Sequence, residues 1–300
     1  MKLLIGNFGA KNLGDELILF AATAQNRDFV AMTADEKFSR EFCEKEFSTV
    51  KFFPAGIFSA IKFLFSGAYF REILELREKI SAVVFCGGGL FSIKFRAVFL
   101  WFLIFLWCKF FLKNAEIFFE NQGVDQNFSG ISKKLIRFVF SRADAISVRD
   151  ERSKIALQNL KIEKKIAVEN DRVENFLRQK FPEKNFDKKK LVVCNAREKA
   201  DFAPIFEKFP QHRKIFVAFE KRDLRVAPPI FGEEIFFPTT AADIFRIFSA
   251  AEIAVGQRLH FLICAEFFCG NQKTFFIEKK YSEKVVNFCA KKKILQFFKN

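Results

Sequence analysis

The sequence has few of the residues that mark metal or disulfide sites. It contains only two histidines, and its seven cysteines form neither a CxxC pair nor a cysteine–histidine cluster with zinc-ligand spacing. An odd number of cysteines, set mostly in apolar segments, indicates buried and reduced thiols in a cytoplasmic protein. The sequence therefore predicts no metal site.

The sequence also lacks an apolar run long enough to cross a bilayer. Lys2 is followed by three apolar residues, too few for the apolar core of a signal peptide. The longest uninterrupted run, Ala97 to Cys108, falls short of the roughly 20 residues that a spanning helix needs. A buried helix is expected there. The alternative is peripheral membrane contact, with Trp101, Trp107 and the flanking cations as interfacial anchors.

The charge and the aromatic content limit the partners. The net charge of +15 favours anionic partners such as phosphorylated small molecules, an acidic membrane surface or nucleic acid. The basic residues are scattered or in short runs, without a long basic arm, so no nucleic acid partner is expected. The 46 phenylalanines, against two tyrosines, indicate phenylalanine at ordinary core positions and no aromatic binding site.

Short apolar strand patterns alternate with helical patterns along the chain, which predicts an α/β fold. Three hundred residues, half of them apolar, are enough for two domains. From Glu163 to Lys190 the sequence is highly charged, and we expect the crossover between domains there, with a helix from Val173 to Lys180. The predicted domains are residues 1–175 and 188–300.

A glycine-containing turn follows the first predicted strand, Lys2 to Ile5. It runs from Gly6 to Glu16 and precedes a helix expected from Leu17 to about Ala24. Its glycine spacing is not that of the dinucleotide fingerprint, and it does not end in the Gly-Lys-Ser/Thr of a P-loop. Asp15 and Glu16 either cap the free amides of the helix or contact a substrate hydroxyl.

Three consecutive glycines, Gly87 to Gly89, follow the predicted strand from Ser81 to Cys86. Each glycine costs ordering entropy, so the run needs a structural reason. Either the backbone approaches a ligand closely, or the chain makes a tight turn beneath the next helix. A second strand, Ala115 to Phe119, leads into a similar polar turn, Glu120 to Gly123.

The stretch from Gly256 to His260 brings together a glycine, an arginine and a histidine where a predicted strand changes into an apolar helix. Ligands of open α/β sheets bind at the carboxyl ends of strands, beside helix N-termini. Arg258 offers a fixed fork of donors for phosphate or carboxylate, and His260 can carry a proton near neutral pH. The alternative is a structural histidine beside a surface arginine.

Taken together, these turns resemble the polysaccharide pyruvyl transferase family. The motifs occur in the family's order across nearly the whole chain: Gly6-Asn7-Phe8-Gly9, Asn12-Leu13-Gly14-Asp15-Glu16, Gly87-Gly88-Gly89, Gln122-Gly123, Val148-Arg149-Asp150-Glu151 with Ser153, Arg258-Leu259-His260, and Tyr281-Ser282-Glu283-Lys284-Val285. The chain departs from the family at Gln257, at the turn after Gly123, and at Asp171-Arg172 in place of an Asp-Pro pair.

The resemblance implies two Rossmann-like domains facing a cleft, similar to GT-B glycosyltransferases. Family members transfer the enolpyruvyl group of phosphoenolpyruvate onto a sugar, which leaves a pyruvate ketal and inorganic phosphate, and they use no redox cofactor. The saccharide acceptor belongs to a cell-wall, capsular or exopolysaccharide precursor and is often lipid-linked, which implies a cytoplasmic enzyme at the inner face of the membrane.

The resemblance also implies residue roles. Arg258 and His260 would be catalytic, with His260 as the general acid. The second domain would hold phosphoenolpyruvate, and the first would hold the acceptor. The substrate-binding residues implied are Arg197, Leu259, Asn12, Gly14, Asp15, Gly88, Gly89 and Gln122.

Two other classes of function fit parts of the sequence. One is a GT-B glycosyltransferase that uses a nucleotide sugar, for which the glutamate that usually holds the ribose is not evident. The other is a binding protein for a membrane surface or nucleic acid, which predicts salt-sensitive binding independent of His260.

Overall fold

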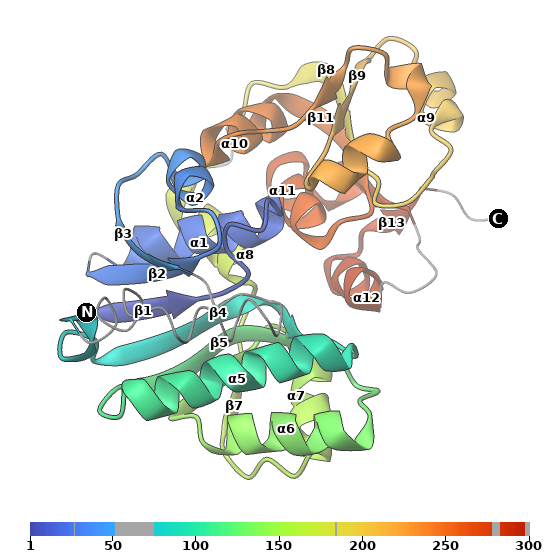
Figure 1. The fold of residues 1–300 in the computed structure, drawn as a ribbon. Helices are drawn as coiled ribbons and strands as arrows, with labels where there is room; N and C mark the ends of the chain where they lie inside the picture. The colour runs from blue at the N-terminus through green and yellow to red at the C-terminus, as the bar shows by residue number, and fades with distance from the viewer. Residues whose placement is uncertain (27, 52–74, 184, 278–282, 298–300) are drawn as a thin grey trace. The chain divides into compact units, whose positions relative to one another are not determined.

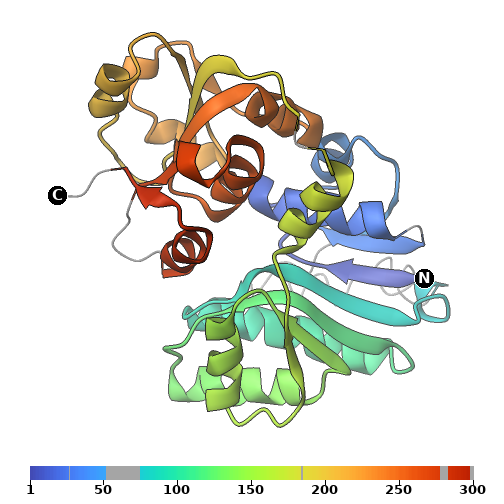
Figure 2. The same ribbon diagram turned by 180° about the vertical axis from the view of Figure 1, so that it is seen from behind.

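A computed structural model describes residues 1–26, 28–51, 75–183, 185–277 and 283–297 (Figures 1 and 2). Contacts divide the chain into two compact units. The first unit consists of Met1–Ala10, Ile18–Arg40 and Lys45–Arg172, and the second consists of Lys11–Leu17, Glu41–Glu44 and Val173–Asn300. Each unit contains one sheet of parallel strands, as the α/β prediction requires.

The described part of the first unit contains a seven-stranded sheet in the order β3-β2-β1-β4-β5-β6-β7. Every neighbouring pair is parallel. The strand order reverses between β1 and β4, as in a Rossmann-like sheet. The strands are β1 (Lys2–Ile5), β2 (Phe29–Thr33), β3 (Ser48–Lys51), β4 (Ala82–Phe91), β5 (Glu116–Val124), β6 (Ala145–Val148) and β7 (Ile166–Val168).

Helices α5, α6 and α7 lie on one face of this sheet (Figures 1 and 2). Phenylalanines fill the space between them and the strands. The ring of Phe119 lies 4.6 Å from that of Phe85 and 4.5 Å from that of Phe140, centroid to centroid. The helices of the first part of the chain are α1 (Leu13–Gln25), α2 (Glu36–Cys43), α5 (Phe95–Phe111), α6 (Gly130–Ser141), α7 (Glu151–Asn159) and α8 (Arg172–Lys180).

Helix α5 contains the longest apolar run of the sequence. The prediction of a buried helix is confirmed for one of its faces, which includes Trp101 and Trp107, only 4% and 6% exposed. Trp101 and Trp107 are therefore not the interfacial anchors of the alternative prediction, because both side chains lie in the core. No helix in the described ranges is both long and apolar enough to cross a bilayer.

The glycine run is not a turn after the strand. Gly87 to Gly89 lie inside β4, where Gly88 pairs with Gln122 of β5. The φ angles of Gly87 and Gly88 are +36° and +77°, a left-handed conformation that side chains disfavour. The pairing register also shifts between Gly88 and Phe91. The glycines therefore allow an irregular strand end to remain in the sheet.

Two other predictions in this unit need correction. Strand β5 continues through the turn that was expected from Glu120 to Gly123. The charged stretch expected to be only a crossover and a helix also contains an edge strand, β7, paired with β6. The sequence departs from the family at Arg172, where the family has proline. In the structure the buried guanidinium of Arg172 forms an ion pair with Glu120. The sequence also shows helical patterns from Ile57 to Phe65 and from Tyr69 to Lys79, and these segments fall wholly or mostly outside the described residues.

The described part of the second unit contains a six-stranded sheet in the order β10-β9-β8-β11-β12-β13, again with parallel neighbours. The order reverses between β8 and β11. In open α/β sheets this reversal creates the crevice in which ligands bind. The strands are β8 (Lys189–Cys194), β9 (Arg213–Val217), β10 (Ile235–Phe236), β11 (Ala251–Gly256), β12 (Thr274–Phe276) and β13 (Leu295–Gln296).

Helices α10 and α11 pack on the central strands of this sheet. Thr240 begins α10 with a capping box, in which its hydroxyl accepts from the backbone N–H of Asp243. Helix α12 ends at Lys292, because the chain then forms β13. The helices of the second unit are α9 (Ala203–Lys208), α10 (Ala241–Ala250), α11 (Leu259–Cys269) and α12 (Glu283–Lys292), with 3-10 turns η1 (Lys221–Arg225), η2 (Pro229–Phe231) and η3 (Asn271–Lys273).

Candidate functional site

The candidate site lies where the strand order of the second sheet reverses. Strand β8 ends at Cys194 and the neighbouring strand β11 ends at Gly256, so the turns that follow them leave the sheet side by side. Asn195 ties the first turn down: its backbone N–H donates to Val255 O at 2.9 Å, and its Nδ2 donates to Val217 O at 2.8 Å. The sheet thus fixes the two turns that carry Arg197 and Arg258.

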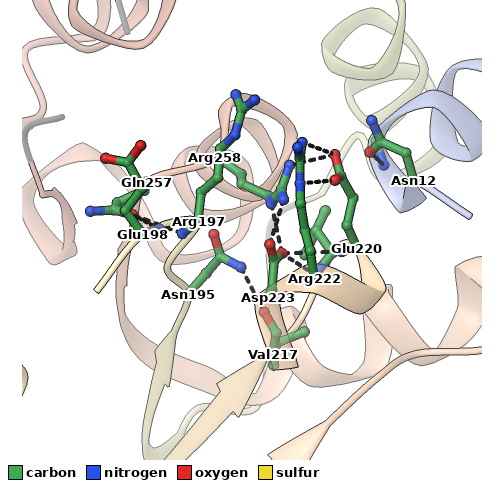
Figure 3. A network of polar contacts seen from close by, with 12 residues as sticks. Asn12, Asn195, Arg197, Glu198, Val217, Glu220, Arg222, Asp223, Gln257 and Arg258 are labelled. Atoms are coloured by element: carbon green, nitrogen blue, oxygen red, sulfur yellow. Dashed lines mark hydrogen bonds and ion pairs between the residues drawn. The ribbon is translucent and has the colours of Figure 1, made fainter. Parts of the chain in front are cut away.

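Arg258 precedes α11 and is 9% exposed. Its Nε donates to Asp223 Oδ2 at 2.6 Å and its Nη1 to Glu220 Oε1 at 2.7 Å, while its Nη2 forms a further ion pair with Asp223 (Figure 3). A guanidinium carries five N–H donors, so these contacts leave two of them for another acceptor. The alternative of a surface arginine is wrong.

The two carboxylates are themselves held by backbone amides. Asp223 is fully buried, and its Oδ2 accepts from the N–H groups of Phe219 and Glu220 at 2.9 and 3.1 Å. The bond from Glu220 N is one half of the capping box of η1; in the other half the Glu220 side chain accepts from the backbone N–H of Asp223. Burial alone would lower the pKa of Arg258, but hydrogen bonds and charge from Asp223 and then Glu220 overcome it, so the pKa is raised. Arg258 therefore stays a fixed cation.

Arg197 stands at the end of the turn after β8 and is partly buried. Its backbone N–H donates to Gln257 Oε1 at 2.7 Å, and that of Glu198 donates to the same oxygen at 3.1 Å. Burial, followed by repulsion from Arg222 and Arg258, lowers the pKa of the Arg197 guanidinium. An anion bound beside it would relieve this repulsion.

Arg222 completes the cationic part of the site. Its Nη2 donates to Glu220 Oε1 at 2.9 Å, so Glu220 bridges Arg222 and Arg258. Arg222 is about half exposed, whereas Arg258 is buried. Three guanidinium groups thus share a small region at one edge of the sheet, which is the donor set that phosphate and carboxylate groups prefer.

His260 lies in the first turn of α11, and Gly14 lies against its ring. A Cβ atom added to Gly14 would meet His260 Nδ1 at 2.4 Å, closer than any real contact. Because Gly14 has no side chain, the backbone at this position can lie directly against the His260 imidazole. The second histidine, His212, is engaged elsewhere, since its Nε2 lies 3.1 Å from Glu252 Oε2.

Residues 11–17 belong to the second unit by their contacts and join the site. Leu13 N donates to Phe219 O at 2.8 Å, and Asn12 forms an isolated antiparallel bridge with Glu220. Asn12 Nδ2 donates to Asp15 Oδ2 at 2.8 Å, and Asn12 Oδ1 accepts from Gly14 N at 3.1 Å. Helix α1 begins at Leu13, earlier than expected, which places Asp15 and Glu16 in its first turn.

The structure therefore brings six of the sequence-predicted residues together in the second unit: Asn12, Gly14, Asp15, Arg197, Arg258 and His260. Leu259 is the buried first residue of α11. Gly88, Gly89 and Gln122 lie in β4 and β5 of the first unit. Gln122 is fully buried there, and its Nε2 donates to Phe85 O at 2.7 Å.

Sequence reasoning missed Glu220, Asp223 and the function of Gln257. The acidic pair lies 35 or more positions before Arg258, and no spacing pattern links them. A capping box at Glu220 was the available signal, but it indicates only the start of a helical turn. Arg149, which the sequence places in the Val148-Arg149-Asp150-Glu151 motif, is also largely buried. Its guanidinium is 8% exposed and packs against Gly123, with Nε 3.6 Å from Asp150 Oδ2.

Metal-ligand groups were not expected from the sequence. Within the ranges that the structure describes, no group of three or more histidine, cysteine, aspartate and glutamate side chains is arranged to hold a metal ion. The site is instead built from guanidinium groups, amides and one imidazole, which suits the recognition of an anion and the transfer of a proton.

Comparisons with known proteins address the family and the fold. A family model described as polysaccharide pyruvyl transferase matches residues 12–268. No curated protein matches the sequence significantly.

Among solved structures, UDP-N-acetylglucosamine 2-epimerase from Rickettsia bellii is 13% identical, with a TM-score of 0.56, over 93% of this chain and 79% of that one. The S. aureus MnaA–UDP complex is 11% identical, with a TM-score of 0.55, over 93% and 78%. Anabaena Alr3699/HepE in complex with UDP and glucose is 13% identical, with a TM-score of 0.50, over 98% and 90%. These similarities show the fold: two Rossmann-like units of the kind found in GT-B-like glycosyltransferases and epimerases.

Proposed function

The chain belongs to the polysaccharide pyruvyl transferase family, and on that premise we propose that it transfers the enolpyruvyl group of phosphoenolpyruvate to a saccharide. The family makes the protein a transferase acting in polysaccharide biosynthesis. The observation that carries the choice of donor is the cluster of Arg197, Arg222 and Arg258 at the strand-order reversal of the second sheet.

Phosphoenolpyruvate carries a carboxylate and a phosphate on one small skeleton, so it needs several cationic donors within a few ångströms. Arg197 supplies the first, because repulsion from its neighbours favours a bound anion. The N–H groups of Arg258 that do not bond to Asp223 or Glu220 supply the second cationic donor. Asp223 and Glu220 hold that guanidinium in one orientation before the ligand arrives, which reduces the entropy lost on binding.

Ketal formation requires a proton at the methylene carbon of phosphoenolpyruvate. Two sugar oxygens bond to the adjacent carbon, the methylene becomes a methyl group and the phosphate leaves. We assign the proton to the His260 imidazole, which lies against Gly14 and belongs to the residue two positions after Arg258. The protons of the two sugar hydroxyls are released, and Asp15 is the proposed acceptor for one of them.

The acceptor is proposed to be a sugar of a cell-surface polysaccharide or of its lipid-linked precursor. In this proposal residues 1–175 form the acceptor-sugar domain and residues 188–300 form the phosphoenolpyruvate domain. Asn12 and Asp15 are the proposed acceptor contacts. A lipid-linked acceptor would bring a cytoplasmic enzyme to the inner face of the membrane.

A GT-B glycosyltransferase activity with a nucleotide sugar is the second candidate. It is favoured only by the shared fold and by two similar structures that contain UDP. Their identities of 11% and 13% leave the ligand of this chain undetermined by similarity. The arginine cluster favours phosphoenolpyruvate as the substrate, because several charged hydrogen-bond donors lie close together there.

The test is an incubation of the purified protein with phosphoenolpyruvate and a panel of nitrophenyl and lipid-linked sugars. We expect phosphate release that depends on the sugar, together with a product that carries a pyruvate ketal. Sugar transfer from a nucleotide sugar, without phosphate release from phosphoenolpyruvate, would establish the second candidate instead.

The Gln257→Ala variant is expected to raise the KM for phosphoenolpyruvate about tenfold while changing kcat less. The substitution removes the oxygen that accepts from Arg197 N and Glu198 N, and leaving a buried donor unpaired costs about 1–3 kcal/mol. Steady-state kinetics measure the two constants separately. Gln257→Glu keeps an acceptor oxygen and is expected to recover most of the loss; equal KM values for the wild type and Gln257→Ala would show that the turn does not need this contact.

The Gly14→Ala variant is expected to reduce kcat by about tenfold to a hundredfold, because small displacements of catalytic groups have effects of this size. The added Cβ would displace the His260 ring. Alanine favours a helix over glycine by about 1 kcal/mol, so the stability lost to the clash is partly offset. Gly130→Ala is the matched control, since a Cβ there meets no atom within 4 Å. Full activity of Gly14→Ala would contradict the proposed placement of His260.

A further inference from the structure

Helix α5 exposes an apolar stripe opposite its buried face. Phe95, Phe99 and Phe110 are 46%, 37% and 67% exposed. They follow one another at helical spacing with the partly buried Phe102 between them, and the rings of Phe95 and Phe99 stack at 5.8 Å between centroids. Since the other face already packs in the core, the helix is apolar on both sides. Such a helix is expected to be covered on both sides.

Helix α6 extends this surface. It packs beside α5, with the ring of Phe138 5.6 Å from that of Phe102. Ile131 at its start is 63% exposed. At its end, the guanidinium carbon of Arg142 lies 3.6 Å from the centre of the Phe138 ring. Apolar side chains and a basic rim therefore continue from one helix to the next. We call the exposed side of α5 and α6 the outer α5–α6 face.

The charge of this face has one sign. Residues 92–115 and 126–143 contain eight lysines and arginines and no aspartate or glutamate. All but Lys109 among these cations are exposed. Of the acids that flank these segments, Glu116 is exposed, whereas the other two accept backbone hydrogen bonds: Asp125 Oδ2 from Ile93 N at 3.0 Å, and Asp144 Oδ2 from Ile117 N at 2.7 Å. Exposed phenylalanines surrounded by uncompensated cations match the chemistry of an anionic bilayer surface.

We propose that the outer α5–α6 face docks on an anionic phospholipid bilayer, with Phe95, Phe99 and Phe110 entering the headgroup region and the cations contacting lipid phosphates. A second copy of the chain is disfavoured as the occupant, because a symmetric contact would place the same cations against each other. The proposal does not depend on the activity proposed above, since it concerns residues outside the arginine cluster.

The test is flotation of the full chain with vesicles of phosphatidylcholine alone or mixed with phosphatidylglycerol. Neither vesicle contains a saccharide acceptor, so the assay reports the surface itself. We expect binding to the anionic vesicles only, with a decline as salt increases. Phe99→Ser/Phe110→Ser and Lys134→Glu/Arg137→Glu are each expected to weaken binding about tenfold or more, since each basic residue and each buried aromatic contributes roughly 1 kcal/mol or more.

Matched controls come from exposed side chains of the second unit. Ile230→Ser/Phe236→Ser removes two exposed apolar side chains, and Lys180→Glu/Lys190→Glu reverses two exposed charges. Both are expected to bind like the wild type. Phe110→Trp should retain binding, with a blue shift of its fluorescence on anionic vesicles, so the proposal is testable even if the double serine variant does not fold.

Three results would overturn the proposal. The first is equal binding to neutral and anionic vesicles, and the second is wild-type binding by the variants of the outer α5–α6 face. The third is a dimer in sedimentation velocity that Phe99→Ser/Phe110→Ser dissociates, because a second copy would then be the occupant.

Discussion

The Arg258→Ala variant is expected to be destabilised by about 3–5 kcal/mol, the usual effect of removing one partner of a buried ion pair. Asp223 is fully buried and would lose the guanidinium that neutralises it, while the largely buried Glu220 would keep only its ion pair with Arg222. Urea denaturation measures the change in the free energy of unfolding. Phosphate release from phosphoenolpyruvate is also expected to fall below detection, since the same residue supplies donors to the bound anion.

Two further variants separate stability from binding. Arg258→Lys keeps the positive charge but cannot form the paired contacts with Asp223 and Glu220, so it should recover only part of the loss. Arg246→Ala is the matched control, because its guanidinium pairs with Asp243 at 2.8 Å but is 74% exposed. It should cost at most about 1 kcal/mol. A change in Arg258→Ala no larger than in Arg246→Ala would contradict the buried network.

The His260→Gln variant is expected to lower kcat by about 10²–10⁴, the usual contribution of a general acid or base. The KM for phosphoenolpyruvate should change much less, because the anion is held by arginines. Glutamine retains hydrogen-bonding capacity but cannot deliver a proton, so stability should stay close to that of the wild type. Steady-state kinetics and thermal unfolding measure the two effects.

The control for this prediction is the other histidine. His212 pairs with Glu252, which in turn accepts a bond from Lys273 at 3.0 Å. His212→Gln is expected to leave kcat unchanged. Undiminished kcat in His260→Gln, or an equal loss in both variants, would remove His260 from the mechanism.

Much of the fold followed from local patterns. Alternating apolar strands and helices predicted an α/β fold, the predicted strand from Lys2 to Ile5 has the bounds of β1, and the strand predicted to change into a helix at Gly256 ends there as β11. These positions are predictable because a buried parallel strand is continuously apolar and the turn after it is polar. The turn that carries Arg258 and His260 could be predicted as a candidate site for the same reason.

The rest depended on contacts between distant parts of the chain. Whether Gly87 to Gly89 end a strand or stay in it depends on the pairing of Gly88 with Gln122, which neighbouring residues do not determine. Likewise, Arg258 has the same sequence context whether it faces solvent or Asp223. The tryptophans of α5 face inward. The helix is apolar on both sides, so the periodicity of its sequence did not indicate which face is buried.

The central claim is that the arginine cluster of the second unit binds phosphoenolpyruvate as the donor. Calorimetric titration of the protein with phosphoenolpyruvate, and separately with UDP-N-acetylglucosamine, tests it most directly. The account predicts that phosphoenolpyruvate binds more tightly and that Arg197→Ala weakens it at least about tenfold, the loss expected for one charge-assisted contact. Tighter binding of the nucleotide sugar, or equal binding of phosphoenolpyruvate by the wild type and Arg197→Ala, would contradict it.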